Sequence, residues 1–262
     1  MTLRMRRAPI LLLLLFLGAP AHAQLHRGAA AGDELLSAKA RLLIVTAHPD
    51  DESLFAPLLG QACAERGAQC SLLVLTRGEN GPCALPEGCG SDLGATRSAE
   101  LRAAADLLHL SLTQWSWPDV MVTHRGEWPA SIADDIAAEV SRFRPTAVIT
   151  FDPLHGSSCH SAHRATAELT AIALARVADP PPLFYLETFH REFVLDDATP
   201  NAPGLRTYSG GWQYLLADLA LHRSQFTDEQ RATLAATPPE RQHVWLLDSR
   251  RADRDWYVFL CL

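Results

Sequence analysis

The sequence of 262 residues contains almost no lysine and has no long apolar run beyond its first 23 positions. Lys39 is the only lysine, and the 23 basic residues against 30 acidic ones give a formal charge of −7. A net acidic chain without a basic run does not favour nucleic-acid binding, which depends on Lys and Arg at the phosphates. Without further apolar runs of roughly 20 residues, a polytopic membrane protein is also excluded. The sequence shows no internal repeat and no low-complexity segment.

The one apolar run, at the N-terminus, has the pattern of a targeting segment. Arg4, Arg6 and Arg7 precede the apolar core at 10–17, and Ala-His-Ala at 21–23 places small residues where a signal peptidase cleaves. The core is too short for a spanning helix, although an uncleaved anchor is the alternative. No lipobox cysteine follows it. We therefore expect residues 1–23 to be a signal peptide, and the mature protein to be exported to the periplasm or the extracellular space without a stable membrane anchor.

The cysteines lack the paired Cys-x-x-Cys spacing of a zinc–cysteine cluster. All six lie in the mature part, at positions 63, 70, 83, 89, 159 and 261. An even number in an oxidising compartment favours disulfides. Cys83 and Cys89 bracket a loop rich in Pro and Gly and form the first candidate pair. Cys63 and Cys70, on either side of a helix-to-strand turn, form the second.

From Arg41 onward, short apolar runs alternate with segments of helical period. Buried strands are expected at 42–45, 71–76 and 146–151, and helices at 53–66, 97–108, 131–143 and 162–177. A loop at 196–211 is then expected to precede a helix at 212–226 and strand-like runs at 244–247 and 256–260. This alternation predicts an α/β fold, a Rossmann-like mostly parallel sheet with helices on both faces. Residues 24–262 are expected to form a single domain.

Polar segments follow three of the expected strands directly. They occupy 47–52 (AHPDDE), 77–81 (RGENG) and 152–163 (DPLHGSSCHSAH). Because ligands bind outside the carboxyl ends of parallel strands, all three segments are expected at one edge of the sheet. This convergence predicts the functional site.

Several residues in these segments form a pattern typical of a metal site. Adjacent carboxylates at a strand end repel each other unless a cation lies among them. His48 and Asp51 are spaced to converge on one ion while Asp50 points elsewhere. His160 and His163 share one face at a helix start. Two imidazoles and a carboxylate match the open three-ligand site of a hydrolytic zinc enzyme. The alternatives without a metal are a simple turn at His48 and a solvated helix start at His160.

With these segments the sequence resembles the LmbE-like/PIG-L deacetylases, which are zinc-dependent hydrolases of N-acetylated amino sugars. The resemblance covers roughly 41–177 and is carried by Ala-His-Pro-Asp-Asp-Glu at 47–52, Thr-Arg-Gly-Glu at 76–79, Arg-Ser-Ala-Glu-Leu at 97–101 and Thr-Phe-Asp-Pro at 150–153 before His160 and His163. His-Arg-Ser-Gln at 222–225 resembles a weaker downstream feature.

The resemblance implies a role for individual residues. His48, Asp51 and His163 would bind Zn²⁺, with Fe²⁺ or another divalent ion also suited to this donor set. Asp50 would be the general base, and His160 would stabilise the oxyanion and protonate the departing amine. The positions implied to contact the sugar are Glu79, Arg97 and Asp119. Many bacterial members read His-Pro-Asp-His where this chain has His160-Ser-Ala-His163, so an orienting partner for His160 must come from elsewhere.

The expected function is therefore removal of the N-acetyl group from an N-acetylglucosamine-type sugar or glycoconjugate. The partner implied is this small-molecule amino sugar, and the oligomeric state is not predicted. One alternative is an amidase of the same family that cleaves a larger acyl group. Another is a catalytically silent sugar-binding module, although such a module has no need for a metal triad together with a separate base.

Overall fold

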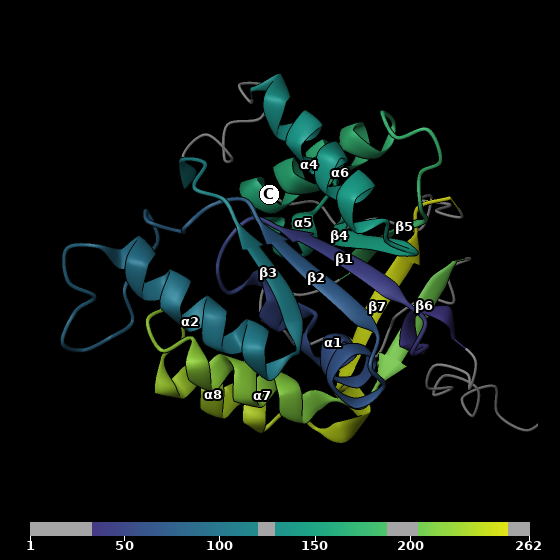
Figure 1. Cartoon of the computed structure of the whole chain (residues 1–262). Helices are drawn as coiled ribbons and strands as arrows, with labels where there is room; N and C mark the ends of the chain where they lie inside the picture. The colour runs from purple at the N-terminus through teal and green to yellow at the C-terminus, as the bar shows by residue number, and fades with distance from the viewer. Residues whose placement is uncertain (1–32, 120–128, 188–203, 251–262) are drawn as a thin grey trace, which may run out of the picture.

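The computed structural model describes residues 33–119, 129–187 and 204–250, built around a seven-stranded sheet (Figure 1). The strand order is β3-β2-β1-β4-β5-β7-β6. The strands are β1 (Arg41–Thr46), β2 (Gln69–Val74), β3 (Leu110–Gln114), β4 (Ala147–Phe151), β5 (Leu183–Glu187), β6 (Leu205–Ser209) and β7 (His243–Asp248). The four pairs among β3, β2, β1, β4 and β5 are parallel, whereas β7 pairs antiparallel with both β5 and β6. The expected mostly parallel sheet is confirmed.

Helices cover both faces of this sheet, as predicted (Figure 1). One face carries α1 (Ala56–Leu59), α2 (Leu93–Leu107), α7 (Trp212–Leu221) and α8 (Asp228–Ala235), and the other carries α4 (Ala130–Phe143), α5 (Gly156–Cys159) and α6 (Ser161–Leu174). Successive side chains of a strand point to opposite faces. Leu42 and Ile44 accordingly join one apolar core, and Leu43 and Val45 join the other. This double burial explains why β1 reads as a continuous apolar run.

Some elements differ from the sequence-based expectation. The helix expected at 53–66 is three joined pieces, a 3-10 turn (Asp51–Leu54), α1 and a π-helical turn (Gly60–Glu65). β6 lies inside the expected loop at 196–211. It was not predicted, because an edge strand with mostly half-buried residues has no continuous apolar run. β3 and β5 were not predicted at all. The helix expected at 212–226 ends at Leu221. The strand-like run at 256–260 lies outside the described residues.

Both expected disulfides are present. Cys63–Cys70 joins the π-helical turn to β2, and Cys83–Cys89 closes the loop that follows β2. No cysteine of the described residues is free. The two closed loops are short, so each bond restrains the chain locally.

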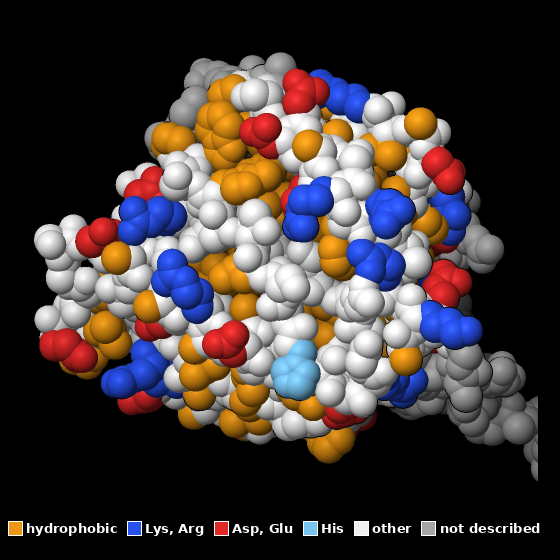
Figure 2. Space-filling view, in the orientation of Figure 1, with side chains coloured by type: hydrophobic (Ala, Val, Ile, Leu, Met, Phe, Trp, Pro, Cys, Tyr) orange, Lys and Arg blue, Asp and Glu red, His pale blue; other side chains and the backbone are white. Residues whose placement is uncertain are grey.

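Charged side chains of both signs are interspersed on the face seen in Figure 2. Within the described ranges, no helix combines the length and apolarity needed to cross a membrane. The expected signal peptide lies outside those ranges, so its assignment stays a prediction.

Close packing of α7 against α1 depends on Gly211. Its φ is +72°, and an added Cβ would lie 2.1 Å from the Pro57 carbonyl oxygen. We expect Gly211→Ala to lower the free energy of unfolding by about 3 kcal/mol, from backbone strain and overpacking together. Gly67→Ala is the matched control, because Gly67 has a φ of +76° but nothing within 4 Å of an added Cβ. It should cost about 1 kcal/mol in urea denaturation. Equal losses for both variants would contradict the packing argument.

Candidate metal centre

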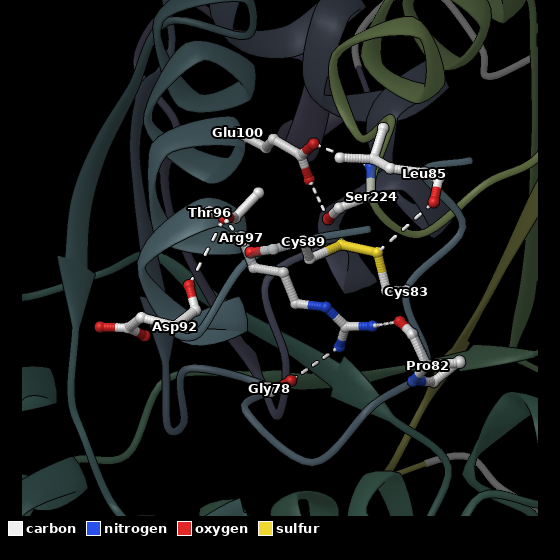
Figure 3. Close-up of a disulfide and its surroundings, with 10 residues drawn as sticks. All are labelled: Gly78, Pro82, Cys83, Leu85, Cys89, Asp92, Thr96, Arg97, Glu100 and Ser224. Carbon is white, nitrogen blue, oxygen red and sulfur yellow. Dashed lines mark hydrogen bonds between the residues drawn. A yellow bond between two sulfur atoms is a disulfide. The ribbon is translucent and has the colours of Figure 1, made fainter. Parts of the chain in front are cut away.

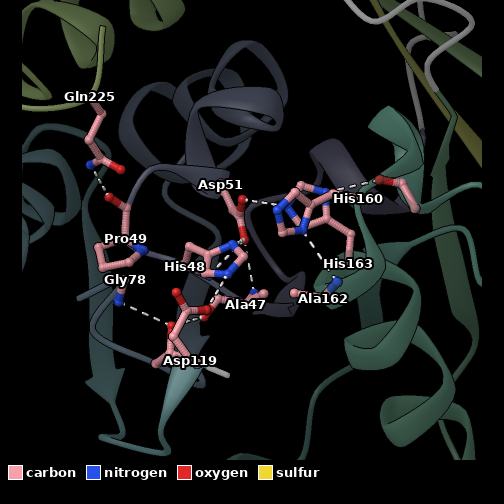
Figure 4. Close-up of polar contacts among 12 residues, drawn as sticks. Ala47, His48, Pro49, Asp51, Gly78, Asp119, His160, Ala162, His163 and Gln225 are labelled. Carbon is pink, nitrogen blue, oxygen red and sulfur yellow. Dashed lines mark hydrogen bonds and ion pairs between the residues drawn. The ribbon is translucent and has the colours of Figure 1, made fainter. Parts of the chain in front are cut away.

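The candidate site lies where the order of the parallel strands reverses. β2 and β3 extend the sheet on one side of β1, and β4 and β5 extend it on the other. Such a reversal opens a crevice at the carboxyl ends of the two central strands. The segment after β1 supplies His48 and Asp51 here, and the segment after β4 supplies His160 and His163 (Figure 4). Two of the three predicted polar segments therefore meet as expected.

Asp51 is the centre of this arrangement. Its Oδ2 accepts hydrogen bonds from the backbone N–H groups of Ala47 (2.9 Å) and His48 (2.7 Å). Its Oδ1 lies 2.8 Å from His163 Nε2. Burial alone would raise the pKa of Asp51, but the charge and hydrogen bond of His163, together with His48, hold it well below its usual range. The carboxylate is thus ionised, and its direction is set by the backbone.

His48 connects Asp51 to a second carboxylate. Its Nε2 lies 2.8 Å from Asp119 Oδ1, and its Nδ1 lies 3.7 Å from Asp51 Oδ2. Burial lowers the pKa of His48, but the hydrogen bonds to Asp119 and Asp51 outweigh it and raise the pKa to about 10. Because Nε2–H is donated to Asp119, Nδ1 is the ring nitrogen that faces Asp51. The carboxylates around the ring favour positive charge at this position.

His163 is oriented by contacts with two neighbours. Its Nδ1 lies 2.9 Å from the Gly156 carbonyl oxygen, which can only accept a hydrogen bond. The neutral ring therefore carries its proton on Nδ1 and has a lone pair on Nε2, facing Asp51. Phe151 stacks against the His163 ring, with ring centroids 4.0 Å apart. Gly156 has a φ of +59°, and a Cβ there would lie 2.9 Å from that of His163.

The donor set fits a divalent transition metal. Potential ligand atoms of His48, His160 and His163 lie within 4.8 Å of one another, and so do those of His48, Asp50 and Asp51. Imidazole nitrogens and a carboxylate are the ligands that Zn²⁺ and Fe²⁺ accept. Because Asp50 and His160 also lie within this range, distance alone does not separate ligands from catalytic groups. The division of roles stays a prediction.

Asp50 differs from Asp51 in its hydrogen bonding. It precedes the 3-10 turn, and within the described part of the chain its carboxylate has no hydrogen-bond partner. Burial and the neighbouring charge of Asp51 raise the pKa of Asp50 to about 6. An unbonded carboxylate with a pKa near neutrality is suited to accept a proton.

His160 stands at the N-terminus of α6. Its Nδ1 accepts a hydrogen bond from the backbone N–H of Ala162 at 3.3 Å, so the neutral ring carries its proton on Nε2. Partial desolvation and the nearby His163 and His48 lower the pKa of His160 to about 4. The ring centroid lies 4.8 Å from that of His163 and 5.1 Å from that of His48. The Ala162 amide thus orients His160 in a chain that has no aspartate between His160 and His163.

The three residues expected to contact the sugar also contact the protein itself. Glu79 Oε1 accepts a hydrogen bond from the Asp119 backbone N–H at 3.0 Å. Asp119 in turn bonds His48, as described above. Arg97 is 5% exposed and donates to the carbonyl oxygens of Gly78 (3.0 Å) and Pro82 (2.8 Å) (Figure 3). Their role toward a substrate stays a prediction, whereas their role in holding the loop after β2 is visible.

This loop is also closed by the Cys83–Cys89 disulfide (Figure 3). We expect replacement of Cys83 and Cys89 by Ala to lower the free energy of unfolding by about 2 kcal/mol, because the unfolded chain gains freedom. Urea denaturation of the double variant and of the wild type would measure this loss. The prediction would be contradicted if the reduced wild-type protein stayed folded and kept the same midpoint of urea denaturation.

Residues missed by the sequence analysis include Phe151, Gly156 and Glu52. Phe151 was assigned to a strand and to the motif at 150–153, and Gly156 to a polar loop, but neither was given a role in the site. Glu52 carried a usable signal, since it is the third acid in a row at a strand end. It is fully buried and bonded to His222, as described below.

Comparisons with known proteins agree with this geometry. The family model described as PIG-L, GlcNAc-PI de-N-acetylase, matches residues 43–174, half of the chain. A 1D-myo-inositol 2-acetamido-2-deoxy-alpha-D-glucopyranoside deacetylase from Actinosynnema mirum is 33% identical over 178 residues, which cover 60% of this chain and 62% of the relative. The chain spans 53% to 62% of the length of the first curated relatives it matches.

Solved structures confirm the fold. The N,N'-diacetylchitobiose deacetylase from Pyrococcus horikoshii has a TM-score of 0.60 at 17% identity, covering 80% of this chain and 84% of the other. The 4-carboxy-2-hydroxymuconate hydratase GalB from Pseudomonas putida reaches 0.61 at 16% identity, covering 80% and 96%. Because a hydratase shares this fold, the fold alone does not identify the reaction. Because the family model matches half of this chain, the chain belongs to the PIG-L (GlcNAc-PI de-N-acetylase) family.

Proposed function

We propose that this protein is a metal-dependent hydrolase that removes the N-acetyl group from an N-acetylglucosamine-type sugar or glycoconjugate. The observation that carries the proposal is the meeting of His48 and Asp51 with His160 and His163 at the reversal point of the sheet (Figure 4). Asp50 lies with His48 and Asp51, its carboxylate within 4.8 Å of their potential ligand atoms. An unbonded carboxylate beside a potential metal site, with an imidazole across from it, is suited to hydrolysis of an amide.

Names of related proteins support the same class of substrate. The Actinosynnema mirum relative is a deacetylase of an acetamido sugar joined to inositol, and the Pyrococcus structure is a deacetylase of diacetylchitobiose. Both names describe an acetylated amino sugar that carries a second group. The proposed substrate of this chain is therefore an amino sugar within a larger conjugate.

The proposed metal ligands are His48, Asp51 and His163, with Zn²⁺ as the proposed ion and Fe²⁺ as the alternative. His48 would offer Nδ1, because Nε2–H is donated to Asp119, and His163 would offer Nε2. Such an ion, when bound, polarises the amide carbonyl and lowers the pKa of a coordinated water toward roughly 7.

In this mechanism the two catalytic side chains divide the proton transfers. The Asp50 carboxylate takes a proton from the attacking water, for which its raised pKa suits it. His160 presents Nε2–H to the oxygen on which charge develops, since its Nδ1 accepts from Ala162. The proton held by Asp50 or His160 then passes to the departing nitrogen, which leaves as the amine while acetate forms. Glu79, Arg97 and Asp119 are proposed to contact the sugar.

The proposed location is outside the cytoplasm. The N-terminal segment has the pattern of a signal peptide, and the two disulfides support an oxidising compartment.

Release of acetate from a substrate panel tests the proposed function. The panel contains N-acetylglucosamine, N,N'-diacetylchitobiose, N-acetylglucosaminyl inositol and the corresponding conjugates with longer acyl chains. We expect acetate release from at least one conjugate, and loss of that activity in His163→Asn. Preference for longer acyl chains would favour the amidase alternative. Binding of the sugars without turnover in metal-loaded protein would favour a silent binding module and contradict the proposal.

A further inference from the structure

A second cluster of ionisable side chains lies behind the loop that carries Asp50 and Asp51. It consists of Glu52 from that loop, Asp218 from α7 and His222, which follows α7. All three are fully buried. None of them belongs to the proposed donor set or to the proposed catalytic pair. The sequence analysis noted His222 only as part of a weak downstream feature.

Hydrogen bonds tie this cluster to the loop at several places. His222 Nε2 donates to Glu52 Oε1, and Ser53 Oγ donates to Asp218 Oδ2. Gln225 Nε2 donates to the Pro49 carbonyl oxygen and lies 3.1 Å from His222 Nδ1. The anchored positions 49, 52 and 53 therefore flank the two aspartates on both sides.

Stability alone does not explain such a cluster. Glu52 Oε2 and Asp218 Oδ1 are buried without a hydrogen-bond partner among the described residues. Burial and the neighbouring charge of Glu52 raise the pKa of Asp218 to about 7. Apolar side chains of similar volume are often as stable as a buried ionic group, or more so. The benefit of the polar cluster must then lie in the geometry it imposes.

The two aspartates depend on that geometry to different degrees. Asp51 is held directly, because its Oδ2 accepts from the Ala47 and His48 amides. The Asp50 carboxylate has no hydrogen bond in the described structure, so its direction follows from the backbone on either side. That backbone is anchored at Pro49, Glu52 and Ser53 by residues 218–225.

We propose that Glu52, Ser53, Asp218, His222 and Gln225 form a clamp whose role is to position Asp50 for proton transfer. This inference rests on the proposed function, in which Asp50 is the general base. The clamp residues are positioning residues, since they act through Asp50 and are not placed in contact with substrate. They give the C-terminal quarter of the chain, which carries no proposed ligand, a part in the reaction.

The first test replaces His222. We expect His222→Phe to lower kcat roughly 10- to 100-fold, with KM and metal content close to wild type. His222→Gln keeps a donor near the position of Nε2 and should recover most of the loss. Ser224→Ala is the matched control, because Ser224 is equally buried but bonds Glu100 instead of the loop. It should change stability and leave kcat unchanged.

A double-mutant cycle identifies Asp50 as the target of the clamp. In an Asp50→Asn background, His222→Phe should reduce the residual rate less than twofold, because the group that it misplaces is already inactive. Additive losses would show that His222 acts on something other than Asp50. If His222→Phe fails to fold, Gln225→Leu serves in the same cycle, since it removes the contacts of Gln225 with Pro49 and His222 but leaves the bond between His222 and Glu52.

Hydrogen exchange tests the clamp without using activity. The peptide covering 47–54 should exchange at least tenfold faster in His222→Phe and Gln225→Leu than in wild type or Ser224→Ala. Unchanged exchange and unchanged kcat in both clamp variants would overturn the proposal. An inactive wild type would count against the proposed function, and the exchange rates would then decide on the clamp alone. A metal bound to Glu52, Asp218 and His222 in His163→Asn protein would also overturn it.

Discussion

Asp50→Asn is expected to lower turnover by roughly 10²- to 10⁴-fold while metal content stays near one ion per chain. The loss corresponds to about 3 to 5 kcal/mol of activation free energy, because an amide cannot accept the proton of the attacking water. Substrate affinity should change little, since the amide is close in shape to the carboxylate. Steady-state kinetics and metal analysis of the same preparation provide the measurement.

Asp51→Ala is the contrasting variant for this experiment. Asp51 accepts from two backbone amides and faces His163, so its removal should lower metal content as well as turnover. The two aspartates are adjacent and chemically identical, which makes the pair a strict test of position. Asp50→Asn protein that loses its metal, or that keeps wild-type turnover, would show that the division of roles is wrong.

Removal of the metal should abolish activity in the wild-type protein. A chelator is expected to withdraw the ion and leave Asp50 and Asp51 without the cation that offsets their repulsion. The metal-free protein should release no acetate. It should also unfold at a lower temperature, because a ligand bound only to the folded state stabilises that state. Re-addition of Zn²⁺ should restore both properties, and Fe²⁺ in a parallel sample tests the alternative ion.

His163→Asn separates metal binding from general damage to the site. The asparagine amide can still donate to the Gly156 carbonyl oxygen but offers no nitrogen in the position of Nε2. We expect lower metal content and activity at a nearly unchanged chain fold. His109→Asn is the matched control, because His109 is exposed and has a φ of +55°, which asparagine tolerates. Full metal content in His163→Asn would refute the ligand assignment.

Much of the sheet could be predicted because β1, β2 and β4 are buried on both faces. Each of them reads as a mostly apolar run, and the helices between them have clear ends. β3 and β6 could not be predicted in this way, because edge strands alternate with polar or half-buried residues. The segment after β1 was expected as one helix, whereas the structure divides it into three pieces, of which the 3-10 turn and α1 contact α7.

The sequence alone was enough to predict that His48, Asp50 and Asp51 would lie at a strand end and that His160 and His163 would lie together at a helix start, although His160 is the extended residue before α6 and does not lie on its face. Local spacing decides both, because strand and helix periods are fixed by backbone geometry. It also indicated Cys83–Cys89 as a candidate pair, because the two residues are close along the chain, and the structure confirms the bond.

The side chains that complete these groups come from distant parts of the sequence and were visible only in the folded chain. The bonds from His48 to Asp119 and from Glu52 to His222 join residues that are 71 and 170 positions apart. No local pattern specifies such contacts, because they depend on how the sheet brings α7 and the segment after β3 against the loop after β1. The buried clamp behind Asp50 therefore became visible only when the strand order and the helix packing were known.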